Sequence, residues 1–333
     1  MAKPCDSSQS QTSKFLNYCI TVDKVKGLEW FALKDFDEEA YKKLILSGRI
    51  LREVREEIQG FVRENMPIIE VCEKAEELIR KKGGEPAFPC NVSINEIAAH
   101  YTSPPGDVRV IPEGSLVKVD MGAHVDGYVT DTAVTICFNP EYRDLVQAAN
   151  QALEVAVKAI GPEMPISTLG ALIEKTIKSR GFKPIRNLTG HQVGRYLVHA
   201  GTSLPNVAQI SFTKLHAGGS YAIEPFVTIP EAEGKVEDSQ EVTIFRFLKQ
   251  KPLKNPYAKK LLKYIEEKFR TLPFTERWLR EVVPKEHYGP AFRELLASKA
   301  IMGYPVFIEA SRKPVAQAEH TVLITDGGCI VLT

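Results

Sequence analysis

The sequence predicts an α/β (α+β) fold of two similar halves, related by a pseudo-twofold axis around a central antiparallel sheet. Three observations predict it: helical and strand patterns alternate along the chain, a β-hairpin pattern covers 116–138, and one segment is repeated. The tripeptide at 66–68, Met-Pro-Ile, recurs at 164–166. The same offset without a gap also matches Glu76 with Glu174, Ile79 with Ile177, Gly83 with Gly181 and Pro86 with Pro184. Two facing copies would enclose a site between them.

The elements of the first copy follow in order. Residues 1–14 are rich in Ser, Gln and Lys, which predicts disorder, and ordered structure is expected from near Phe15. Acidic residues after Asp37, an N-cap candidate, open a helix that runs to about residue 63. A second helix fits 68–82 and ends at a glycine pair. Short strands are expected around Ser93 and Arg109, followed by the hairpin with its turn at Asp126 and Gly127.

The second copy begins with helical patterns over 141–160 and 166–180, and 249–300 belongs to neither copy. That stretch predicts an inserted helical subdomain with helices over 259–270 and 288–299. Between Arg246 and Arg270, nine Lys or Arg residues stand against two acids. A solvated helical face explains this charge most simply, and a patch that contacts RNA or an acidic partner is the alternative.

Composition excludes several classes of protein. The chain of 333 residues is 44% hydrophobic and 26% charged, and 43 basic residues nearly balance 42 acidic ones. These values are typical of a globular protein and exclude a wholly polybasic surface. We expect no membrane span and no secretory signal, because no long apolar run is present. Six irregularly spaced cysteines predict a reduced, cytoplasmic compartment rather than a disulfide framework.

Common catalytic motifs are absent, and the chemistry must come from carboxylates and histidines. The sequence contains no phosphate-binding glycine loop, no H-E-x-x-H and no G-x-S-x-G. In the hairpin, the turn places Asp120 directly or diagonally opposite Asp131, both within apolar strands. Facing like charges destabilise a ladder, and a cation between them would remove the penalty. The alternative is that one aspartate faces solvent and the other lies in a bulge.

The second half of the chain adds His191, Glu224 and Glu319, each flanked by apolar, β-prone residues. Alone, His191 is most simply a satisfied structural residue, and each glutamate is most simply a capped or edge-exposed carboxylate. Together with the two aspartates they suit hard or borderline divalent ions. Four carboxylates and one imidazole can hold two ions and leave room for an activated water. In addition, the repeat offset places His100 one residue from His199, so each half offers a histidine to the same cleft.

Five segments carry a resemblance to the methionine aminopeptidases, specifically the short, archaeal-like type 2 form. They are PAFPCNVSINEIAAHYTSPPGD (86–107), VKVDMGAHVDGYVTDTAVT (117–135), NLTGHQVGRYLVHAG (187–201), YAIEPF (221–226) and AEHT (318–321). The resemblance covers about residues 30–333. It implies the pita-bread fold, with a catalytic domain over 29–248 and 301–333, the type 2 insertion over 249–300, and a partly disordered extension over 1–28.

The resemblance also implies roles for particular residues. The ligands of two divalent ions (Co, Mn, Fe or Zn) would be Asp120, Asp131, His191, Glu224 and Glu319, with Asp131 and Glu319 as bridges. Glu224 would also shuttle protons, and His100 and His199 would contact the substrate near the scissile bond. The methionine side chain would lie among Phe88, Phe226 and Tyr304, an aromatic slot that suits a thioether.

The activity implied is removal of the initiator methionine from nascent polypeptides with a small second residue, by a hydroxide that the two metal ions activate. The expected partners are nascent N-termini, with a possible ribosome contact through 249–270, and the expected state is a monomer. One departure from the family is the stretch Val227 to Glu231, where the family has a glycine-rich turn. Two alternatives remain: a proline-specific pita-bread peptidase, and a non-catalytic relative that binds ribosomes or RNA.

Overall fold

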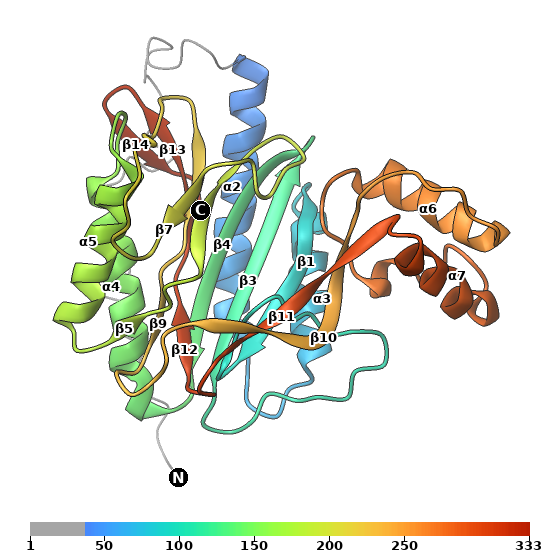
Figure 1. Cartoon of the computed structure of the whole chain (residues 1–333), viewed down its shortest axis with the longest axis horizontal. Helices are drawn as coiled ribbons and strands as arrows, with labels where there is room; N and C mark the ends of the chain where they lie inside the picture. The colour runs from blue at the N-terminus through green and yellow to red at the C-terminus, as the bar shows by residue number, and fades with distance from the viewer. Residues whose placement is uncertain (1–36) are drawn as a thin grey trace.

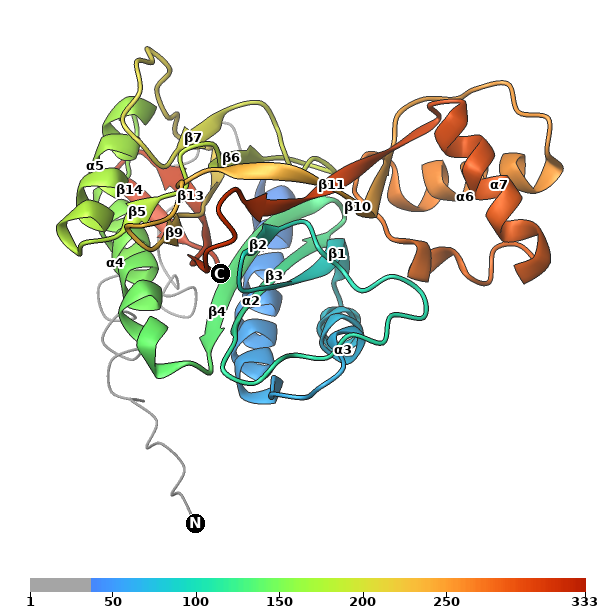
Figure 2. The ribbon, with the colours of Figure 1, turned by 60° about the horizontal axis from the view of Figure 1, so that its bottom comes forward.

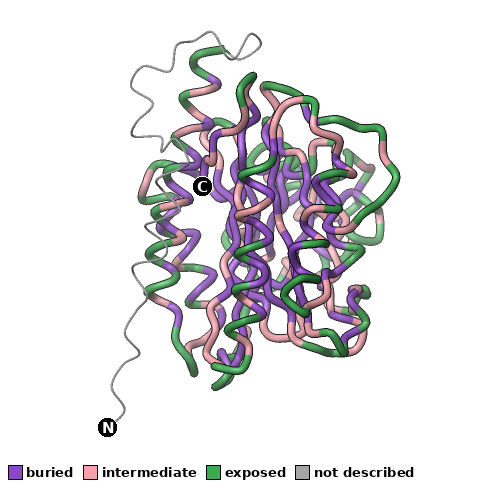
Figure 3. The backbone as a smooth tube through the Cα atoms, turned by 90° about the vertical axis from the view of Figure 1, so that its left-hand side faces the viewer, coloured by how far each residue is buried: buried purple, intermediate pink, exposed green. Residues whose placement is uncertain are grey.

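A computed structural model gives the structure of the chain and describes residues 37–333. The disorder expected over 1–14 and the extension expected over 1–28 lie outside the described residues. Figure 1 shows two groups of helices and strands side by side, with a third, helical group projecting from one edge. The tube in Figure 3 shows that burial concentrates in the strands and on the helix faces that cover them.

The first half consists of two helices packed on a three-stranded sheet, in the strand order β1-β3-β4. Asp37 caps the first helix by accepting a hydrogen bond from the amide of Glu39, as predicted. Figure 2 shows both helices on the same face of these strands. The elements are α2 (Glu38–Phe61), α3 (Ile68–Lys81), β1 (Glu85–Ile94), β2 (Ile97–Ala99), β3 (Leu116–Val125) and β4 (Tyr128–Cys137).

The predicted hairpin is confirmed, and the predicted strand at Arg109 is wrong. Strands β3 and β4 pair from Leu116 with Cys137 to the turn at Asp126 and Gly127. Around Arg109, by contrast, the chain makes one isolated bridge. The reason is local: Arg109 bonds back to the Asp107 carboxylate through its amide and its side chain, which turns the exposed backbone away from a ladder.

The second half repeats the plan with α4 and α5 against a five-stranded sheet, in the order β14-β13-β8-β6-β7, and a smaller sheet, in the order β12-β9-β5. Both helices cover the positions predicted, within about three residues at their ends. The elements are η3 (Pro140–Tyr142), α4 (Arg143–Ala159), α5 (Ile166–Ser179), β5 (Lys183–Pro184), β6 (Thr189–Val193), β7 (Ser203–Pro205), β8 (Ser220–Ile223), β9 (Phe226–Thr228), β12 (Val315–Gln317), β13 (His320–Thr325) and β14 (Gly328–Val331).

The sequence repeat corresponds to a structural repeat. Helices α3 and α5 both have 14 residues, and both begin directly after the proline of the repeated tripeptide. The residues two positions before these prolines, Asn65 and Glu163, have the same left-handed backbone, with φ of 62° and 63°. Each proline also makes an isolated bridge to a later segment, at Val110 and Lys214 respectively. The two halves therefore share backbone geometry as well as residue identities.

The third group is carried by a long antiparallel ribbon of β10 (Val236–Phe247) and β11 (Ile301–Glu309), which β2 extends to a three-stranded sheet by pairing with β11. Between these strands lie α6 (Pro256–Phe269), η4 (Glu276–Leu279) and α7 (Lys285–Ala297), which pack around an apolar cluster of their own. Figures 1 and 2 show α6 and α7 standing away from both halves. The exact domain division, with 249–300 as the insertion, stays a prediction.

Candidate metal centre

The five predicted ligands come from both halves of the molecule. Strands β3, β4 and β6 carry three of them, and the two glutamates lie in the short gaps between β8 and β9 and between β12 and β13. In the hairpin, Asp120 pairs with Ala133 and Asp131 with Gly122. The two aspartates are thus diagonal neighbours on one face of the sheet, which is the second of the two arrangements predicted.

The structure brings these side chains together. The ligand atoms of Asp131, His191 and Glu319 all lie within 4.8 Å of one another. The His191 Nε2 atom lies 3.5 Å from a carboxylate oxygen of Asp131 and 3.5 Å from one of Glu224. Asp120 is adjacent, within side-chain hydrogen-bonding range of Asp131. The metal site itself stays a prediction, supported by this arrangement.

Burial makes the cluster unfavourable without a compensating positive charge. It raises the pKa of Asp120 to about 7. Burial, followed by the charges of neighbouring carboxylates, raises the pKa of Asp131, Glu224 and Glu319 well above the usual range. Burial also lowers the pKa of His191 to about 3, so its imidazole is neutral. A divalent cation binds a neutral imidazole, so His191 is already in the protonation state that metal binding requires.

Unsatisfied buried atoms in the cluster also fit a cation. One carboxylate oxygen each of Asp120, Asp131 and Glu319 is buried without a hydrogen-bond partner. Buried polar atoms are normally paired, so such a concentration indicates a missing electropositive partner. Oxygen-rich donors with one imidazole suit Mn, Fe, Co or Zn. The residues present therefore fit the divalent metal that the resemblance implied.

Threonine hydroxyls join the two halves at the cluster. Strands β4 and β13 belong to different sheets, yet the Thr321 hydroxyl accepts from the Asp131 amide at 2.7 Å and donates to the Asp131 carbonyl at 2.8 Å. Thr135 makes the mirror-image pair of bonds to the carbonyl and amide of Gln317, at 2.7 and 2.9 Å. Between them, the amide of Glu319 bonds to the carbonyl of Ala133. These bonds fix the separation of the ligand-bearing strands.

The two predicted substrate histidines lie at the same centre. The His191 and His199 rings are 4.4 Å apart, and His100 packs against Phe307, with ring centroids at 4.4 Å. Burial, and to a lesser degree the nearby His199, lowers the pKa of His100 to about 4. His199 keeps exposed surface, yet its pKa is also lowered, first by desolvation and then by the charge of Arg246. Both imidazoles are neutral at pH 7 and can donate or accept one hydrogen bond.

Of the three aromatic residues predicted to form the pocket, Tyr304 lies beside His100, and the structure does not show the three as one slot. The Tyr304 ring lies 5.6 Å from His100, edge to face. Phe88 belongs to an apolar cluster with Val193 and Val198, whereas Phe226 belongs to a different one. Phe88 packs so closely on Gly122 that a Cβ there would lie 2.2 Å from its ring. The pocket assignment stays a prediction.

Gln317 is a site residue that the sequence did not single out. Its side-chain amide donates to Glu224 at 3.3 Å and to Glu319 at 3.4 Å. It occupies the alternate position before Glu319, so the two side chains point the same way in an extended segment. The two-residue spacing of Gln317 and Glu319 could therefore have identified Gln317 from the sequence. Thr321 lies within a quoted motif, but its partner is 190 residues away, and only the fold reveals their contact.

A buried centre of carboxylates and histidine between two α/β halves is typical of a metal-dependent hydrolase. The chain matches the model of metallopeptidase family M24 over residues 42–326, and it belongs to that family. A methionine aminopeptidase of Methanothermobacter thermautotrophicus is 43% identical over 298 residues, which cover 89% of this chain and 98% of the relative. The corresponding enzyme of Methanocaldococcus jannaschii is also 43% identical and covers 89% and 99%. Within family M24, the chain therefore belongs to the methionine aminopeptidases.

Solved structures confirm the pita-bread fold. A thermophilic Arx1 aligns with a TM-score of 0.77 and 20% identity, covering 89% of this chain and 91% of that one. A methionine aminopeptidase from Thermotoga maritima gives 0.66 and 22%, covering 90% and 99%. The prolidase from Pyrococcus furiosus gives 0.57 and 20%, and only 64% of its chain is covered. At these identities the likeness concerns the fold alone, and the proline-specific alternative is not favoured.

Proposed function

We propose that this chain removes the initiator methionine from nascent polypeptides with a small second residue. The observation that carries the proposal is the buried convergence of Asp131, His191 and Glu319, with ligand atoms within 4.8 Å, in a chain of this family. The curated archaeal relatives, which share 38 to 43% of their residues with it, are named methionine aminopeptidases. Membership of a metallopeptidase family implies a bound divalent metal.

We propose that the site binds two divalent ions. All five predicted ligands would hold them: Asp120, Asp131, His191, Glu224 and Glu319. Four carboxylates can offset the charge of two such ions, and one ion would leave carboxylates uncompensated. When bound, the ions supply Lewis acidity toward a carbonyl and toward water. Co, Mn, Fe and Zn all suit this ligand set. Their identity would be decided by availability more than by affinity.

The protein's own groups supply proton transfer and orientation. The raised pKa of Glu224 suits a general base that takes a proton from the attacking water and passes it to the leaving amine. Neutral His199 lies beside His191 and can donate a hydrogen bond to the developing oxyanion. His100, on the Tyr304 and Phe307 side, can hold the substrate backbone. Phe88, Phe226 and Tyr304 would contact the methionine side chain.

The test is a panel of peptides incubated with metal-loaded protein, with free methionine measured by chromatography. We expect release from Met-Gly and Met-Ala peptides, much slower release from Met-Leu, and none from N-acetylated Met-Gly. The acetylated peptide is the matched control, because it differs only in the free α-amine. Cleavage of Gly-Pro without release of methionine would instead assign the chain to the proline-specific branch.

The number of ions is tested separately, by elemental analysis of protein dialysed against low metal concentrations. Two ions per chain would support the proposal. A plateau at one ion, with full activity, would overturn the dinuclear assignment and leave the aminopeptidase assignment intact.

We further propose that the protein acts as a monomer and contacts the ribosome through 249–270. Charge supports the contact: Lys249, Lys254, Lys259, Lys260 and Lys263 are all exposed. An RNA surface would bind such a face with strong salt dependence. Co-sedimentation with ribosomes should therefore occur at low salt and be lost as salt increases. Absence of binding at low salt would contradict this contact.

Within the described residues, no helix is long and apolar enough to cross a membrane.

A further inference from the structure

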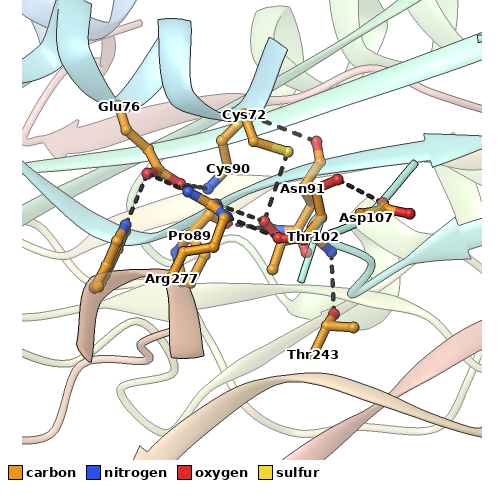
Figure 4. Close-up of polar contacts among 11 residues, drawn as sticks. Cys72, Glu76, Pro89, Cys90, Asn91, Thr102, Asp107, Thr243 and Arg277 are labelled. Atoms are coloured by element: carbon orange, nitrogen blue, oxygen red, sulfur yellow. Dashed lines mark hydrogen bonds and ion pairs between the residues drawn. The ribbon is translucent and has the colours of Figure 1, made fainter. Parts of the chain in front are cut away.

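A buried ion pair connects the inserted helices to the first half of the molecule. The Arg277 guanidinium in η4 donates to both carboxylate oxygens of Glu76 in α3, at 2.7 and 3.0 Å. Each side chain is 3% exposed. Trp278 donates its indole N–H to the same carboxylate at 2.7 Å, and the amide of Cys90 in β1 adds another bond at 3.2 Å. Figure 4 shows Glu76, Cys90 and Arg277 converging between α3, β1 and the insertion.

Arg277 makes more hydrogen bonds than are needed to attach the insertion to the first half. A buried ion pair often contributes little net stability, because desolvation of both charges offsets their attraction. An apolar contact would anchor the insertion as well. What the guanidinium offers instead is five donors in a fixed planar arrangement. Two of these donors reach beyond Glu76 to a different segment.

That segment directly follows His100. The Arg277 Nε atom donates to the Ser103 carbonyl at 2.7 Å, and Nη2 donates to the Thr102 hydroxyl at 3.1 Å. The Thr102 amide in turn donates to the hydroxyl of Thr243 in β10, at 3.2 Å. Thr102 and Ser103 are fully buried although they belong to no strand or helix. The two hydroxyls themselves donate to Cys72 in α3 and to Asp107, so the insertion and its supporting ribbon satisfy the other polar groups described here.

The backbone at His100 needs such support. Its φ is 67°, in the left-handed region that a residue with a Cβ adopts only at a cost. Residues held there persist where the surroundings determine the conformation. Before His100, strand β2 is fixed by the pairing of Ala99 with Phe307 in β11. After it, Arg277 holds Thr102 and Ser103. The histidine is therefore constrained from both sides by residues near or within the insertion.

We propose that Arg277 is a positioning residue, which holds the segment after His100 and so orients this histidine toward the substrate. The inference rests on the proposed function, in which His100 contacts the substrate. It gives the insertion a role in the site: η4 supplies the support, and Glu76 orients the guanidinium through its two bonds. The alternative is that Arg277 merely fastens the insertion.

Arg277→Lys separates these two roles. A lysine ammonium can keep the charge pair with Glu76, but it cannot also reach the Ser103 carbonyl and the Thr102 hydroxyl in the planar arrangement of the guanidinium. Leu295→Ala is the matched control, because Leu295 is fully buried in the insertion's own apolar cluster and makes none of the hydrogen bonds of this network. The control weakens the insertion and leaves Arg277 in place.

The measurements are steady-state kinetics on a Met-Gly peptide, and hydrogen exchange of the backbone amides of 99–106 followed by mass spectrometry. For Arg277→Lys we expect kcat to fall about tenfold, KM to change less than about threefold, and exchange in 99–106 to speed up. For Leu295→Ala we expect normal kcat and normal exchange in that segment. If Arg277→Lys does not fold, Thr102→Val takes its place, since it removes the Nη2 bond and spares the ion pair.

Kinetics and exchange within twofold of the wild type for Arg277→Lys would overturn the proposal, as would equal effects of Leu295→Ala. Exchange is measured without substrate, so it decides the positioning of the segment independently of activity. A wild-type protein inactive on methionine peptides would contradict the proposed function. The exchange result would then still show whether Arg277 holds the segment.

Discussion

At the scale of single residues, the site depends on carboxylates placed where carboxylates are unfavourable. Asp131 is 3% exposed, and its pKa is raised by burial and by its acidic neighbours. Such a residue lowers stability unless a cation or a proton compensates its charge. The presence of an aspartate at position 131 is thus explained by the chemistry of the site and not by packing.

Asp131→Asn tests this explanation, with Asp126→Asn as its matched control in the turn of the same hairpin. Asp126 is partly exposed and pairs with Lys43 and Arg195, so its loss should leave the site intact. We expect Asp131→Asn to lose at least one bound metal ion and about 100-fold or more of the activity. Elemental analysis and methionine release measure both effects. Equal behaviour of the two variants would show that Asp131 is not a ligand.

The hydroxyl contacts of Thr321 lead to a second prediction at this scale. Thr321→Val leaves the amide of Asp131 buried and unpaired, which should cost about 1–3 kcal/mol in the free energy of unfolding. Thr135→Val breaks the equivalent bonds at Gln317 and should cost a similar amount. Activity should separate the two variants, because only Thr321 holds a predicted bridging ligand. We expect about a tenfold loss of kcat/KM for Thr321→Val and a smaller one for Thr135→Val, measured beside urea unfolding.

If the two threonine variants lose stability and activity in the same proportion, the hydroxyl bonds serve only to join the strands.

At the scale of elements, helix α2 shows how closely the halves are packed. It contains Gly48 and Gly60, in the same helical conformation but in different surroundings. A Cβ at Gly48 would lie 2.6 Å from the carbonyl oxygen of Leu332, whereas a Cβ at Gly60 would meet nothing within 4 Å. One glycine is thus required by the contact with the C-terminal residues, and the other is not.

Gly48→Ala should therefore lower the free energy of unfolding by about 1–3 kcal/mol, because the backbone of Leu332 must move. Gly60→Ala should raise it by about 0.5–1 kcal/mol, since alanine is the better helix former and no clash opposes it. Thermal and urea unfolding of the two variants give the comparison. The packing described for α2 would be wrong if both substitutions had the same sign.

Most elements were predictable from the sequence because their signals are local. The hairpin combines strand patterns with an Asp-Gly turn, and α2 has an acidic first turn after its cap. The strand expected at Arg109 failed because two side-chain bonds to Asp107 compete with a ladder, which a β pattern does not reveal. The roles of Thr321 and Arg277 were not predictable, because their partners lie far away in the sequence.

At the scale of the whole molecule, metal binding and protonation must be linked. Asp120 has a pKa near 7, and the other three carboxylates of the cluster have raised pKa values. Protons therefore occupy the ligand oxygens increasingly as the pH falls through 7, and a metal ion must displace them. His191 is already neutral and releases no proton.

We accordingly expect metal binding to metal-stripped protein at pH 7 to release protons, and the Kd to rise about tenfold per pH unit for each displaced proton between pH 8 and pH 6. Titration calorimetry in buffers with different ionisation enthalpies measures the release. Binding heats that do not depend on the buffer, together with a constant Kd, would show that the carboxylates are ionised before the metal arrives.

The two halves and the hydroxyl contacts between them surround one buried centre. We conclude that this centre makes the chain a metal-dependent methionine aminopeptidase. The most direct test is the release of free methionine from a Met-Gly peptide by metal-stripped protein, as Mn, Fe(II), Co or Zn is added back. We predict no release without metal, and release that rises with added ion to a plateau. Undiminished release by the fully stripped protein, or no release with any ion from a folded protein, would contradict this conclusion.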